Sequence, residues 1–335
     1  MAGAVDEMNL VLGVDGGNTK TLALVARGDG VILGTGRAAC GDIYGAPSPD
    51  AAIAEIERAV DAALSEAGIQ AAELNAGAFS LAGADWPEDF ELLANAMRVR
   101  GYGEQIVIVN DAIGALRAGS PDGAGVVVSC GTGTAIGARG TNGRIWHSSF
   151  WQEPQGAGEL SLKALRAVYR AELGIDPPTA LTEPILAAFA ACNVEEVLHR
   201  MTGRELPRPE NWRQLVRPLF DAADAGDATA RRIVISHGKD LGDYAIAAAR
   251  QVGLLETPFT LVLTGGVLRH PSPLMREALV GRVQETARGV RTTQSRFEPV
   301  TGAALLALDL VLINTDAVLL ERLEATLPGA AFFAT

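Results

Sequence analysis

The stretch GVDGGNTKT, residues 13–21, follows a short apolar run and stands between two segments with the composition of β-strands. Its two adjacent glycines let the backbone approach a ligand closely, because no β-carbon intervenes. Successive N–H groups in such a turn form a small concave surface that binds anions, and threonine hydroxyls add neutral donors. Asp15, at the end of the first strand, offers the oxygen ligands that Mg²⁺ prefers. The stretch therefore predicts a hairpin tip that holds phosphate groups and a metal ion.

A second stretch of the same kind, SCGTGTA, occupies residues 129–135. Neither stretch matches the GxxxxGK[ST] loop or the GxGxxG fingerprint, and each one alone also fits a tight hairpin that needs glycine only for its turn. Two such tips facing each other would hold a chain of phosphates from both sides. The predicted phosphate-binding residues are Gly16, Gly17, Asn18, Thr19 and Lys20 in the first tip and Gly131, Thr132, Gly133 and Thr134 in the second.

The order of predicted elements repeats along the chain, with one tip near the start of each half. The first half reads as three strands within 9–39, a helix between Ser48 and Gly68, a strand over 76–83, a helix over 87–99, a strand over 105–111 and a short helix. The second half reads as strands over 124–130, 134–140 and 143–149, helices within 157–252, a strand over 259–266, a helix over 272–288, an extended segment over 290–297 and a helical end over 301–326.

This repeat predicts an α/β fold of two βββαβαβ(α) domains around a central cleft. We expect the domains to span residues 1–120 and 121–300, and the C-terminal helix of residues 301–335 to pack back onto the first domain. Clefts between domains are common ligand sites, so the two tips are expected to meet there.

The composition excludes several classes of protein. The chain of 335 residues has a formal net charge of −12 and no visible basic patch, so nucleic acid is not an expected partner. Its three cysteines form no CxxC pair and its four histidines lack zinc-ligand spacing, which favours a reducing compartment. The first ten residues carry acidic side chains where a signal peptide is basic, and the apolar run 302–313 is short and interrupted by Asp309. We therefore expect a cytoplasmic protein without a membrane partner.

Asp111 is the strongest candidate for a catalytic carboxylate. It follows the apolar strand QIVIV and precedes a predicted helix, and ligands of α/β sheets bind at the carboxyl ends of strands. Such an aspartate also suits a helix cap, which leaves a purely structural role open. Asp85, in LAGADWP, is the alternative carboxylate and could equally cap the helix that follows Pro87. Asn110 is expected to support Asp111 or to hold substrate.

Four motifs together give the chain a family resemblance. GVDGGNTKT, NDAIGAL (110–116), SCGTGTA and LTGGV (263–267) stand in the order and spacing of the sugar-kinase, chaperone and actin superfamily of ATPases. More narrowly, nearly the whole chain resembles the N-acetylglucosamine and glucosamine kinases, which are grouped with the BadF/BadG/BcrA/BcrD-type ATPases. The resemblance implies a duplicated ribonuclease H-like, or actin-like, ATPase fold that binds ATP and Mg²⁺.

The resemblance also implies roles for the motifs. The two tips correspond to the two phosphate segments, and LTGGV corresponds to the adenosine segment, with Gly265 and Gly266 against the nucleotide. Asp111 corresponds to the base that acts on a sugar hydroxyl, expected to be the 6-hydroxyl of glucosamine or N-acetylglucosamine. The family further suggests a homodimer and closure of the domains around both substrates.

Two loops correspond to the family's acceptor-binding segments. In CGDIYG, Asp42 stands where many relatives have asparagine, and an ionised carboxylate would favour the ammonium of a free amino sugar; a plain turn aspartate is the alternative. Tyr44 fits either a sugar stack or the core. In SSFWQEPQGAGELS the family's usual Gly-Asp-Glu-Gly is replaced by QGAGELS, so Gly156 and Glu159 are the predicted acceptor residues. Phe150 and Trp151 offer apolar faces for a sugar ring.

Three other functions fit the same scaffold. One is the ATPase activator of a radical dehydratase or reductase, which needs paired thiolates for an iron–sulfur cluster, and Cys40, Cys130 and Cys192 are scattered. Another is a kinase of a different sugar or polyol. The third is a sugar sensor without catalysis, against which the retention of Asp15, Asp111 and both tips argues.

Overall fold

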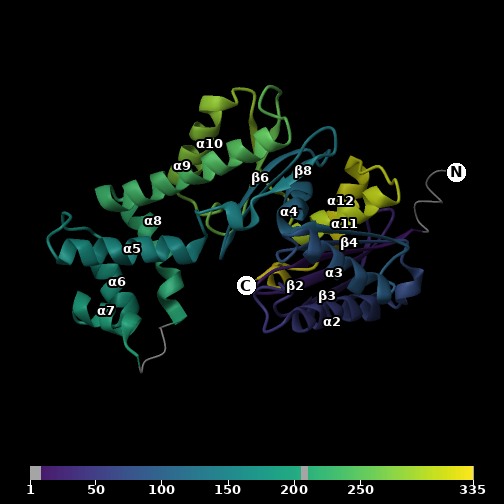
Figure 1. The fold of residues 1–335 in the computed structure, drawn as a ribbon, viewed down its shortest axis with the longest axis horizontal. Coiled ribbons are helices and arrows are strands. Elements are labelled where there is room, and N and C mark those ends of the chain that lie inside the picture. Colours follow the sequence, from purple (N-terminus) through teal and green to yellow (C-terminus); the bar gives the residue numbers. More distant parts are fainter. Residues whose placement is uncertain (1–8, 205–209, 335) are drawn as a thin grey trace.

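The computed structural model describes residues 9–204 and 210–334. It contains two five-stranded mixed sheets, one in each of two lobes (Figure 1). The first sheet lies with α2 (Pro49–Ala67) and α3 (Pro87–Val99) in one lobe, and α5 (Ala157–Glu172) to α8 (Val216–Asp224) form the far end of the other.

The first sheet has the order β3-β2-β1-β4-β5. Its strands are β1 (Leu10–Gly16), β2 (Thr21–Arg27), β3 (Ile32–Ala38), β4 (Ala76–Leu81) and β5 (Gln105–Asn110). The first three strands pair antiparallel, while β4 pairs parallel to both β1 and β5. Leu12 and Val14 pack with α2 and α3, whereas Val11 packs on the opposite face with the C-terminal helices. Burial of both faces explains why β1 reads as one apolar run rather than an alternating pattern.

The second sheet repeats this topology in the order β8-β7-β6-β9-β10. Its strands are β6 (Gly125–Cys130), β7 (Thr134–Arg139), β8 (Ile145–His147), β9 (Thr260–Thr264) and β10 (Arg291–Gln294). The helices between β8 and β9 are α5, α6 (Thr182–Phe189), α7 (Val194–Thr202), α8 and α9 (Ala228–Gln251), and α10 (Leu274–Thr286) precedes β10. The pairing directions match those of the first sheet. The predicted duplication and the α/β fold class are confirmed.

Helix α4 (Asp111–Gly119) lies between the two sheets and contacts strands of both. All its residues from Ala112 to Ala118 are buried, because small side chains let it approach its neighbours closely. A β-carbon at Gly137 of β7 would lie 2.7 Å from the Ala112 side chain, and one at Gly302 would overlap the carbonyl oxygen of Gly114. Helix α4 contacts both sheets and belongs to neither alone. The expected domain boundary between residues 120 and 121 therefore stays a proposal.

The C-terminal end differs from the single helix that the sequence predicts. It forms α11 (Pro299–Leu310), α12 (Ala317–Thr326) and α13 (Ala330–Phe333). Leu312 takes a left-handed φ of 59°, and Asp316 caps α12 by accepting from the Leu319 N–H. The buried Arg117 of α4 donates to Asp309 at 2.9 Å and to Thr315 at 2.8 Å, so the break is held from the centre of the molecule. As expected, α11 does pack on β1 and β4 of the first sheet.

No helix within residues 9–204 and 210–334 is both long and apolar enough to cross a bilayer. The expected compartment and the homodimer stay predictions.

Candidate active site

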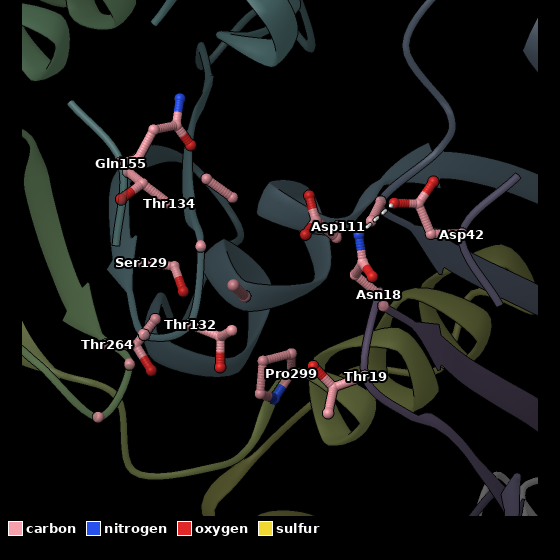
Figure 2. A pocket seen from close by; sticks show the side chains of 18 of the residues that line it. Asn18, Thr19, Asp42, Asp111, Ser129, Thr132, Thr134, Gln155, Thr264 and Pro299 are labelled. Carbon is pink, nitrogen blue, oxygen red and sulfur yellow. Dashed lines mark hydrogen bonds between the residues drawn. The ribbon is translucent and has the colours of Figure 1, made fainter. Parts of the chain in front are cut away.

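A cavity of about 1350 Å³ opens between the two lobes, and both hairpin tips line it. Figure 2 shows Asn18 and Thr19 of the first tip on one side, Thr132 of the second tip on the other, and Asp111 between them. Of the predicted site residues, Gly16 and Gly156 do not line this cavity, while the remaining fifteen do. Most of the residues that the sequence predicts for the site therefore lie on the wall of one cavity.

The first tip is a tight turn whose apex is open to the cavity. The Gly17 N–H donates to the Lys20 carbonyl at 2.9 Å, and Asn18 and Thr19 at the apex are exposed. Gly16 has a different task, because a β-carbon there would lie 2.6 Å from the Leu81 side chain of β4. Gly17 therefore shapes the tip, and Gly16 allows the strands behind it to meet.

The second tip is built in the same way and is backed by the segment after β9. The Gly131 N–H donates to the Gly133 carbonyl at 2.9 Å. Gly265 takes a left-handed φ of 92°, and a β-carbon there would lie 2.5 Å from the Cys130 carbonyl carbon, so only glycine suits this approach. Gly266 faces open space instead. The predicted adenosine segment thus adjoins the second phosphate tip.

Asp15 and Asp111 bring two half-buried carboxyl groups to the centre of the cavity. Burial raises the pKa of Asp15 to about 7, and the nearby Asp111 carboxyl raises it further, while Lys20 opposes the shift. Burial also raises the pKa of Asp111 to about 7, with Asp85 the next contributor. Two carboxyl groups that resist ionisation in each other's presence would be neutralised by a divalent cation.

Replacing Asp15 with asparagine is expected to raise the Tm of the metal-free protein by about 2–4 °C at pH 8. The folded-state pKa lies near 7 and the unfolded value near 3.8, so stability falls as pH rises from 4 to 7. Asparagine carries no charge and avoids this loss. Thermal unfolding at pH 4.5 and pH 8 without divalent cations measures the effect, and an equal change in Tm at both values would contradict it.

Asp111 and Asp85 differ in how their oxygens are used. Asp85 Oδ1 accepts from Ser149 Oγ at 2.6 Å and from Asn110 Nδ2 at 3.1 Å. Asn110 caps α4 by accepting from the Ala112 N–H, so the cap is Asn110 and not Asp111. The pKa of the Asp111 carboxyl is lowered by the backbone N–H groups of Ala112 and of Asp111 itself. Asp111 is therefore the carboxylate that remains available to a ligand.

The end of the cavity beside Asp111 is acidic and aromatic. Asp42 is buried, accepts from the Tyr44 N–H at 2.9 Å as a turn aspartate does, and also accepts from Asn18 Nδ2 at 3.4 Å (Figure 2). Phe150 reaches this end from the second lobe and packs edge-on against Tyr44. Among the described residues that line the cavity, the lysine and arginine side chains are Lys20 and Arg269.

The two predicted acceptor residues of the second lobe, Gly156 and Glu159, occupy different positions, and only Glu159 lines the cavity. Gly156 packs behind the second tip, where a β-carbon would lie 2.5 Å from the carbonyl oxygens of Thr132 and Gly133. Glu159 lines the cavity but binds Lys163 at 2.9 Å and the Gln155 N–H at 2.5 Å. Both residues thus support the second tip and its loop, and their role as acceptor ligands stays a prediction.

Sequence reasoning missed several residues of the cavity wall. The additional polar lining residues include Ser129, Ser148, Ser149, Gln152, Gln155, Thr264, Arg269 and Glu298. Trp212 and Leu162 add apolar surface, and Phe333 enters from the C-terminal end. The short GTG motif could have drawn attention to the adjacent Ser129, but nothing local marks Phe333 or Arg269.

The donor set fits ATP with Mg²⁺. Glycine-shaped tips with exposed threonines provide a phosphate cradle, and Gly133 and Gly266 face open space that a β-carbon would fill. Within the described residues no group of three or more His, Cys, Asp and Glu side chains could hold a metal. Mg²⁺ beside a nucleotide is usually held by one or two carboxylates together with phosphate oxygens and waters, and Asp15 would be the protein ligand here.

The cysteines are not arranged for a shared cluster within the described chain. Cys130 is buried at the end of β6, Cys40 follows β3, and Cys192 is exposed between α6 and α7. Burial raises the pKa of the Cys130 thiol to about 12, which disfavours the thiolate that cluster binding needs. No specific contact favours the activator function.

Known proteins resemble this chain over most of its length. It is 27% identical over 317 residues to N-acetyl-D-glucosamine kinase of Dictyostelium discoideum, covering 90% of this chain and 98% of that protein. It is 25% identical over 280 residues to N-acetylmuramic acid/N-acetylglucosamine kinase of Clostridium acetobutylicum, covering 81% and 89%. Its fold matches that of a ROK family glucokinase from Streptomyces griseus, solved with glucose and AMPPNP, with a TM-score of 0.57, 19% identity and coverage of 90% and 100%.

The expected actin-like ATPase fold is therefore confirmed, and the family is decided by a match that spans both lobes. Residues 12–307 match one family description, from the first strand to α11. The chain belongs to the BadF/BadG/BcrA/BcrD ATPase family.

Proposed function

We propose that the protein catalyses ATP-dependent phosphorylation of an amino sugar, with Asp111 as the base. The observation that carries this proposal is the place of Asp111, at the start of α4 between two glycine-rich tips. The names of the relatives, which are hexosamine kinases, support the same reaction class.

In the proposed reaction, Asp111 takes the proton of the sugar hydroxyl as the oxygen bonds to the γ-phosphorus and ADP departs. When bound, Mg-ATP supplies the phosphoryl group and neutralises its negative charge. The tips donate backbone N–H groups and threonine hydroxyls to the phosphates, and Asp15 holds the metal. Catalysis then depends mostly on positioning and charge stabilisation by the residues of the cavity wall.

The acidic acceptor end favours a free amino sugar over an acidic one. Asp42, Asp85 and Asp111 all line it, whereas Lys20 binds the Phe333 carbonyl and Arg269 pairs with Glu298 at 2.7 Å. An ammonium group would be attracted there, and a carboxylate such as that of N-acetylmuramic acid would be repelled.

We therefore expect a kcat/KM for glucosamine at least about tenfold above that for N-acetylglucosamine, with N-acetylmuramic acid lowest. ADP release with Mg-ATP and a panel of these sugars, N-acetylmannosamine, glucose and no sugar measures this. Asp42→Asn should reduce the ratio of kcat/KM for glucosamine to kcat/KM for N-acetylglucosamine, because the asparagine side chain keeps the hydrogen bond of the turn but carries no charge. An unchanged ratio would remove Asp42 from the proposal, and ADP release that ignores every sugar would remove the kinase itself.

The site of phosphorylation is proposed to be the 6-hydroxyl, following the family resemblance. The ³¹P–¹H coupling of the product distinguishes this position from the anomeric and secondary hydroxyls.

A further inference from the structure

The C-terminal segment, residues 327–334, returns to the phosphate side of the cavity. In Figure 1 the C-terminus lies between the two lobes, beside β2. Phe332 and Phe333 pack edge-to-face with ring centroids 5.2 Å apart, and their rings lie against Leu22, Leu24 and Val300. Phe333 itself lines the cavity, together with Lys20 and Leu22. The segment is thus anchored by apolar burial next to the first tip.

Two backbone carbonyl groups of this segment bind the cations of the first lobe. The Phe333 oxygen accepts from Lys20 Nζ, and the Phe332 oxygen accepts from Arg37 Nη1 at 2.6 Å. Burial lowers the pKa of Lys20, and the nearby Arg37 lowers it further. The carbonyl dipoles therefore compensate two positive groups that would otherwise repel each other.

A carbonyl acceptor suits a lysine that must keep its charge for a ligand. A carboxylate in the same place would cancel the positive charge of the ammonium group. A neutral carbonyl oxygen accepts one of the three N–H bonds of the Lys20 ammonium and leaves the other two for a ligand. Lysine is otherwise a flexible side chain with a large rotamer entropy, so a fixed acceptor reduces the entropy that ligand binding would cost.

We propose that the C-terminal segment is part of the nucleotide site, because it holds the Lys20 ammonium in place for the phosphates. Lys20 contacts the ligand, and Phe332 and Phe333 are positioning residues. The inference rests on the proposed binding of ATP at the two tips.

The test compares binding of MgADP and MgAMPPNP by isothermal titration calorimetry in four proteins. They are the full chain, a truncation that ends at Gly329, Lys20→Met, and the two changes combined. The truncation should weaken MgAMPPNP binding about tenfold, because an unanchored Lys20 side chain must then be ordered when the nucleotide binds. In the Lys20→Met background the truncation should have little further effect, because the coupled group is already absent.

A matched control removes only residue 335, which keeps both phenylalanines and leaves the Phe333 carbonyl in a peptide bond, and it should bind like the full chain. If the truncation unfolds, Phe332→Ser with Phe333→Ser releases the anchor at full length and takes its place. In active protein, the KM for ATP should rise while the KM for the sugar stays unchanged.

The outcomes separate the two proposals. A full chain that binds no nucleotide overturns both of them. A full chain that binds nucleotide, beside a folded truncation that binds it equally well or more tightly, overturns only the role of the segment. If the truncation weakens nucleotide binding equally in the wild-type protein and in Lys20→Met, the segment does not act through Lys20.

Discussion

Asp111→Asn is expected to lower kcat for the proposed sugar kinase reaction by about a thousandfold, within the range that general bases contribute. The amide can still accept a hydrogen bond but cannot take the hydroxyl proton, so binding of sugar and nucleotide should change little. Steady-state ADP release and calorimetric nucleotide binding together separate these two effects. Since burial raises the pKa of Asp111 to about 7, wild-type activity should also fall as pH decreases below that value.

Asp85→Asn is the matched control for this loss. Its Oδ1 atom accepts from Ser149 and Asn110, and an asparagine oxygen accepts the same two bonds. The variant should keep activity within about tenfold of the wild type. If Asp85→Asn loses more activity than Asp111→Asn, then Asp85 and not Asp111 is the base.

Gly302→Ala destabilises the protein by about 3 kcal/mol or more, the upper range for overpacking a core. A β-carbon at 302 would overlap the Gly114 carbonyl oxygen and lie 2.7 Å from the Ala118 nitrogen, so α11 and α4 must separate. Because α4 carries Asp111, activity should fall together with stability. Urea denaturation followed by circular dichroism gives the free energy of unfolding.

Gly281→Ala makes the same chemical change in an exposed turn of α10, where a β-carbon meets no atom within 4 Å. There the alanine should stabilise the helix by about 0.5–1 kcal/mol. We expect the free energy of unfolding to decrease in Gly302→Ala and to increase in Gly281→Ala. A neutral Gly302→Ala would mean that the α4–α11 contact is looser than its geometry indicates.

The parts of the site that the sequence predicts are those formed by neighbouring residues. Each tip is a hairpin turn, so the local composition around Gly17 and Gly131 is enough to predict it. Asp111 is recognisable because a strand, a polar pair and a helix follow one another directly. The α2 helix is likewise bounded by its own cap residues, Ser48 and Gly68.

The features that the sequence could not reveal depend on partners far along the chain. The break after α11 is held by Arg117, 192 residues before Asp309. Gly156 looked like an acceptor residue because of a motif, yet its lack of a side chain serves contact with the second tip. Asn110 and Asp111 are neighbours in the sequence, and both residue types suit a helix cap. Only the geometry of the structure shows that Asn110 is the cap of α4.

The place of the C-terminus has a practical consequence for purified protein. Phe333 lines the cavity between the two lobes and is the third residue from the end of the sequence. An affinity tag fused to that end would leave the protein at the mouth of the cavity, and its histidines or acidic residues would compete for the metal or for Lys20. A tag placed before β1 avoids this interference, because Leu10 lies at the opposite end of that strand from the first tip.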